Sequence, residues 1–152
     1  MQVESIKDIL EWTVHFHHEL AACLKDCTDK NENARAKLLL GYLATHEKTL
    51  ENMVAEFERT ANLNALNTWC YEYLDKHPVI KHKHSDVPFS KLDTKQIMET
   101  VTQLHEQVID LYQDLYDRAP VESEKELLKQ LLDVEDHEAM RISQSANRLE
   151  DL

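Results

Sequence analysis

Apolar residues recur at three- and four-residue intervals in four separate segments of the chain, and this spacing strongly constrains the fold. Such spacing lines one face of an α-helix and leaves the opposite face to water. The four stripes are Ile9, Thr13, Phe16, Leu20 and Leu24; Leu39, Leu43, Leu50, Val54 and Phe57; Ile97, Val101, Leu104, Val108, Tyr112 and Leu115; and Leu128, Leu131, Val134, Ile142 and Leu149. Four helices that bury these faces against one another satisfy all four patterns.

Residues that interrupt helices are almost absent from the chain. Its 152 residues include one glycine and three prolines, while 30% of them are charged. This composition favours helix over sheet. A chain of this length also buries a core of its own as one domain. We therefore expect an all-α fold in a single domain that covers residues 1–152.

The predicted helix ends and connections indicate how the helices are joined. Asn31 or Asn33 can cap the second helix, Asp93-Thr94-Lys95-Gln96 has the form of a cap for the third, and Ser123-Glu124-Lys125-Glu126 is a capping box for the fourth. The turns after the first and third helices are short, so each of these helices is antiparallel to the next.

The connection between the second and third helices is much longer. It contains a short amphipathic pattern from Leu66 to Leu74 and a loop from Val79 to Ser90. Neighbouring antiparallel helices usually need about two to eight connecting residues, whereas this connection has about thirty. The sequence therefore predicts an antiparallel four-helix bundle with a long crossover between helices 2 and 3.

A His-Glu dipeptide occurs in each of the four predicted helices. The four dipeptides are His18-Glu19, His46-Glu47, His105-Glu106 and His137-Glu138. The second and fourth dipeptides occupy equivalent positions when their helices are aligned on the apolar stripes. The first helix has two registers against the third, one of which places His17 opposite His105 and the other His18.

Helical geometry indicates which of these side chains face inward. At about 100° per residue, Glu106 points away from its stripe and His105 lies at the stripe's edge. We therefore expect His105 to face the interior beside Glu138 and Glu106 to face water. His18 points outward, which favours His17 as the inward residue, although His18 and Glu19 remain alternatives. His46 and Glu47 flank their stripe, and Glu138 lies within its own. The predicted inward set is His17, His46, Glu47, His105 and Glu138.

Two helix pairs, a long crossover and aligned Glu-bearing segments resemble the ferritin-like superfamily, closest to its rubrerythrin-like members. Such proteins hold a di-metal centre with one Glu from each of two helices and a Glu-x-x-His from each of the other two. The resemblance implies that Glu47 and Glu138 are the glutamates of that motif. The chain departs from it where Leu50 and Arg141 replace the motif histidines and His105 replaces a glutamate.

The predicted inward set combines imidazole and carboxylate groups, which suit iron, manganese, zinc or nickel. We expect a divalent transition metal as cofactor, and the resemblance implies redox or iron-handling chemistry. The alternative is a degenerate bundle without metal that acts as a structural or interaction module. Arg141 supports this alternative, because its charge can offset a buried Glu138. Whether the protein is an enzyme stays open.

The net charge of -12 repels phosphate backbones and anionic lipid, so nucleic acid and membrane surfaces are excluded as partners. No apolar run reaches the roughly 18 to 20 residues needed to cross a bilayer. The first residues also lack the basic start of a signal peptide, so we expect a cytoplasmic protein. The resemblance implies a homodimer and, for redox chemistry, an unidentified electron-donor protein.

Overall fold

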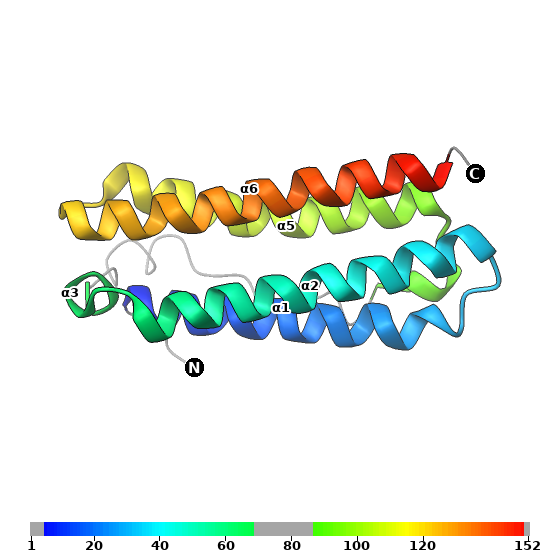
Figure 1. Cartoon of the computed structure of the whole chain (residues 1–152), viewed down its shortest axis with the longest axis horizontal. Helices are drawn as coiled ribbons and strands as arrows, with labels where there is room; N and C mark the ends of the chain where they lie inside the picture. The colour runs from blue at the N-terminus through cyan, green and yellow to red at the C-terminus, as the bar shows by residue number, and fades with distance from the viewer. Residues whose placement is uncertain (1–4, 69–86, 151–152) are drawn as a thin grey trace.

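The computed structural model describes residues 5–68 and 87–150, and these two ranges are all-α without any strand (Figure 1). The elements are α1 (Ile6–Thr28), α2 (Ala34–Thr60), α3 (Leu63–Leu66), the 3-10 helix η2 (Phe89–Lys91), α5 (Thr94–Arg118) and α6 (Glu122–Glu150). No helix in the described ranges is both long and apolar enough to span a bilayer.

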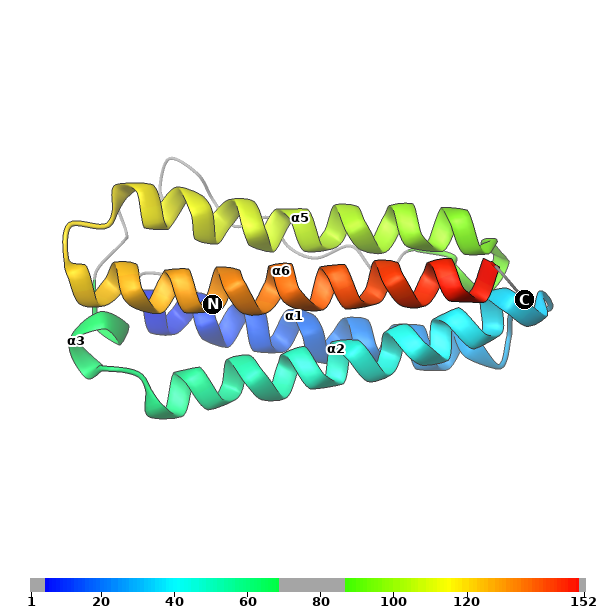
Figure 2. The same ribbon diagram turned by 45° about the horizontal axis from the view of Figure 1, so that its top comes forward.

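The four long helices lie side by side as two pairs, α1 with α2 and α5 with α6 (Figure 1). Within each pair the two helices run in opposite directions, whereas α2 and α5 run in the same direction (Figure 2). Helix α2 also contacts α5 and α6, which closes the two pairs around a common core. The predicted all-α fold and its packing as a helical bundle are confirmed.

The connection between α2 and α5 is described only at its two ends. Helix α3 packs against α6 near the first end. Asn31 secures the second end, because its buried side-chain amide donates hydrogen bonds of 3.0 Å to the carbonyls of both Phe89 and Leu92. Most of the predicted short helix and loop falls in residues 69–86, outside the described residues.

Local hydrogen bonds cap the ends of the helices, and α2 has one of its two predicted caps, whereas the start of α6 differs from the prediction. Asn33, rather than Asn31, caps α2 by accepting a 3.1 Å bond from the Ala36 amide. The predicted capping box at Ser123 is wrong, because α6 begins at Glu122 and Ser123 lies inside its first turn. The Asp93 capping box of α5 is confirmed, and α1 has a similar box of Ser5 with Asp8 that the sequence analysis missed.

The apolar stripes meet in one core that contains most of the residues predicted for it. Val134, Leu149 and Phe57 are only half-buried. Four buried ionisable side chains, one on each long helix, are joined by hydrogen bonds within this core. They are His17, Glu47, His105 and Glu135.

Candidate metal centre

Each of these four side chains occupies a position in the apolar face of its helix. Glu47 lies one turn from Leu43 and one turn from Leu50, both of which are fully buried, so the α2 backbone directs Glu47 into the core. The exposed fractions are 0% for His17 and Glu47, 3% for His105 and 1% for Glu135. Burial of this kind is unfavourable for ionisable groups unless they find partners.

The four side chains are joined in a continuous chain of hydrogen bonds across the bundle. Glu47 Oε2 lies 2.6 Å from His17 Nδ1, and its other oxygen contacts His105 Nε2. The second ring nitrogen of His17, Nε2, lies 2.8 Å from Glu135 Oε1. The cluster therefore links α5 to α2, α2 to α1, and α1 to α6.

The charges of the cluster are mutually dependent. Burial alone would lower the pKa of His17, but the carboxylates of Glu135 and Glu47 outweigh it and raise this pKa from 6.5 to about 10. Burial alone would raise the pKa of Glu47, but His105 and His17 lower it from 4.5 to about 2. Without a metal, His17 is therefore an imidazolium that donates one hydrogen bond from each ring nitrogen, to Glu47 and to Glu135.

Glu135 has one carboxylate oxygen that the cluster does not satisfy. Its Oε2 is buried and has no hydrogen-bond partner among the described residues. The nearby Tyr112 hydroxyl, whose pKa is raised by burial and by the charge of Glu135, donates instead to Thr13 Oγ1 at 2.8 Å. An orphaned buried carboxylate oxygen is uncommon in folded proteins and indicates a position for a cation or a water molecule.

The donor atoms are close enough to converge on a single ion. One ligand atom from each of His17, Glu47 and His105 lies within 4.8 Å of the others. Ligands at about 2.1 Å from a tetrahedral metal lie about 3.4 Å apart, so movements of about 1 Å would bring these donors to bonding distance. Glu135 would then hold the other nitrogen of His17, an arrangement typical of metal-bound histidine.

His46 and Glu138, also predicted as ligands, form a separate pair between α2 and α6. His46 Nδ1 lies 2.9 Å from Glu138 Oε2, and Arg141 donates to Glu138 Oε1 at 3.2 Å. The side chain of Glu138 is 2% exposed, that of His46 12% and that of Arg141 57%. Both oxygens of Glu138 are therefore occupied by groups other than the buried cluster.

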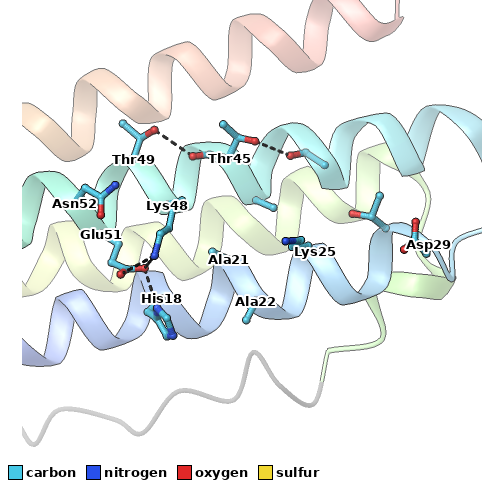
Figure 3. Close-up of a pocket in the computed structure, with 13 residues that line it drawn as sticks. His18, Ala21, Ala22, Lys25, Asp29, Thr45, Lys48, Thr49, Glu51 and Asn52 are labelled. Atoms are coloured by element: carbon cyan, nitrogen blue, oxygen red, sulfur yellow. Dashed lines mark hydrogen bonds and ion pairs between the residues drawn. The ribbon is translucent and has the colours of Figure 1, made fainter.

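The predicted register of α1 and α5 agrees with the observed burial. His17 is buried, whereas His18 is exposed in a groove between α1 and α2, where its Nδ1 lies 2.9 Å from Glu51 (Figure 3). On α5, His105 is buried and Glu106 is exposed, as predicted. The partner of His105, however, is Glu47 rather than the expected Glu138.

Glu135 is the member of the cluster that the sequence analysis missed. The buried face of α6 follows Leu128, Leu131, Glu135, Glu138 and Ile142, which are separated by three or four residues. The prediction placed Val134 on this face instead. Extending the spacing from Leu131 by four residues rather than three would have identified Glu135.

Comparisons of the chain with protein-family models, curated proteins and solved structures found no match.

Proposed function

We propose that this protein binds a divalent transition-metal ion through His17, Glu47 and His105, with Glu135 orienting His17. The observation that carries the proposal is the approach of three donor atoms from three different helices to within 4.8 Å inside the core. A second buried carboxylate with an unpartnered oxygen adds negative charge and a further possible ligand. Together these groups form a cation site that requires all four long helices.

The donor set narrows the choice of metal. Two imidazoles with one or two carboxylates suit iron, manganese or zinc, whereas calcium and magnesium prefer oxygen ligands alone. Bound iron or manganese would supply redox chemistry, and bound zinc would supply Lewis acidity. The four side chains of the cluster are at most 3% exposed, so bulk water is kept from the centre.

The proposal includes a ferritin-like arrangement, closest to rubrerythrin-like proteins, and a role in iron handling or redox chemistry. The helix directions support it (Figure 2). On α6 the motif glutamate would be Glu135 rather than the Glu138 assigned from the sequence, because Glu135 and Glu138 have the spacing of the family's Glu-x-x-His motif, with glutamate in place of histidine. His17 and His105 would occupy the positions of the two single glutamates. The proposal also includes a cytoplasmic homodimer that receives electrons from a separate electron-donor protein.

A metal-free structural module is the second candidate, and one observation favours it. Glu47 is satisfied through both oxygens and His17 through both ring nitrogens. The chain of His105, Glu47, His17 and Glu135 can therefore persist as a network of charged hydrogen bonds without an ion. In that case the cluster would specify helix pairing and carry no chemistry.

Metal analysis of protein expressed in iron-, manganese- and zinc-supplemented media distinguishes the two candidates. We expect about one ion per chain in at least one medium, and Glu47→Gln should abolish binding because it removes the central charged ligand. Glu106→Gln is the matched control, since Glu106 is exposed on α5 beside His105 and should retain the metal. Less than about 0.1 ion per chain in every medium would favour the structural module.

A further inference from the structure

We infer that this centre holds one metal ion rather than two, because Arg141 takes the place of a second cation at Glu138. The inference rests on the proposed metal binding by His17, Glu47 and His105. It concerns the pair of His46 on α2 and Glu138 on α6, which are neighbours in sequence of the cluster residues Glu47 and Glu135. His46 directly precedes Glu47 on α2, and Glu138 follows Glu135 by one helical turn on α6.

The nearest positions on α2 and α6 from which a second ion could take further ligands lie one turn beyond Glu47 and Glu135. On α2 that position is Leu50, which is fully buried and offers no donor atom. On α6 it is Glu138, with His46 at 2.9 Å as the nearest additional ligand. The chain therefore retains one carboxylate and one imidazole at the second position, so an ion held there would complete its coordination with water molecules.

The carboxylate of Glu138 already has a positively charged partner, the guanidinium of Arg141. Glu138 is 2% exposed, so its charge needs a compensating partner. Arg141 provides that partner at 3.2 Å, and a guanidinium stays charged at any physiological pH. A divalent ion at Glu138 would have to displace Arg141 and then remain close to its positive charge. The geometry therefore makes this pair a second cation site that Arg141 blocks.

Removing Arg141 should open the second site. Titration of metal-stripped protein with cobalt(II), followed by calorimetry and by the visible absorption of the bound ion, should saturate at about one ion per chain in the natural protein and about two in Arg141→Met. Arg148→Met is the matched control, because Arg148 is an exposed arginine two turns further along the same face of α6. It should saturate at about one ion.

The double variant Arg141→Met/Glu138→Gln locates the additional ion. It should return to about one ion per chain, because the carboxylate that binds the second ion has been removed. The side chain of Arg141 is 57% exposed, so its removal leaves no cavity in the core, and circular dichroism should confirm that each variant is folded.

The stoichiometries separate failure of the inference from failure of the proposed function. Two ions on the natural protein, or a single ion on folded Arg141→Met, would overturn the inference and leave metal binding intact. A second ion that persists in the double variant would also overturn it. If neither the natural protein nor Arg141→Met binds cobalt(II), the proposed function fails and the inference fails with it.

Discussion

Replacing Glu47 by glutamine in metal-stripped protein tests whether the buried network is ionised. Glu47 contacts His17 and His105 through its two oxygens and is fully buried. The fold lowers its pKa from 4.5 to about 2, and at about 1.4 kcal/mol per pKa unit this corresponds to about 3 kcal/mol of stabilisation. For a chain of this size we expect the melting temperature to fall by roughly 6 to 12 °C.

The loss should depend on pH with a definite sign. Because the fold lowers the pKa of Glu47, its contribution is present above pH 4.5 and is lost as the pH falls towards 2. Because the fold raises the pKa of His17, its contribution is fully present below pH 6.5 and is lost as the pH rises towards 10. The difference in the free energy of unfolding between the natural protein and Glu47→Gln should therefore be greatest between about pH 4.5 and pH 6.5.

Urea unfolding in the presence of a chelator measures this difference at about pH 5.5 and about pH 9.5. Glu51→Gln is the control, because Glu51 lies one turn further along α2 and pairs with the exposed side chains of His18 and Lys48. Its replacement should cost less than about 1 kcal/mol. The reasoning is refuted if Glu47→Gln unfolds like the natural protein at the lower pH, or if the difference grows as the pH rises.

Three further predictions concern the same core. Metal affinity should increase as the pH rises from about 6.5 towards 10, opposite to the stability of the metal-free protein, because His17, whose pKa is raised to about 10, must lose a proton to bind metal. Competition with a coloured chelator measures this affinity. His105→Ala should weaken metal binding by at least about tenfold with unchanged helical circular dichroism, and an unchanged affinity would remove His105 from the site. Tyr112→Phe should lower the free energy of unfolding by about 1 kcal/mol in urea titration, since it removes one hydrogen bond to Thr13; a loss above about 3 kcal/mol would show that the hydroxyl has a second buried partner.

Local periodicity was sufficient to predict the helices and the inward residues of α1 and α5. His17 was preferred over His18, and His105 over Glu106, because a shift of one residue rotates a side chain by about 100°. These predictions require no knowledge of the neighbouring helices. His17 and His105 are buried whereas His18 and Glu106 are exposed, in agreement with these predictions.

The partners of the inward residues could not be predicted in the same way. Whether His105 meets Glu47 or Glu138 depends on the relative heights of the helices, which the spacing of residues within one helix does not determine. The similarity of His46-Glu47 to His137-Glu138 also predicted that Glu138, rather than Glu135, belongs to the site. In the structure His137 is exposed, so only half of that similarity concerns the interior.

The chain of contacts through all four helices also determines how the helices can slide along one another. A slip of α2 by one turn, about 5.4 Å, would leave His17 facing Leu43 or Leu50 instead of Glu47. The leucines would still be buried, but in a dry interior His105 would lose its carboxylate partner and His17 would lose one of its two. A core made only of leucine would tolerate such slips. The polar centre therefore favours a single longitudinal register of the four helices.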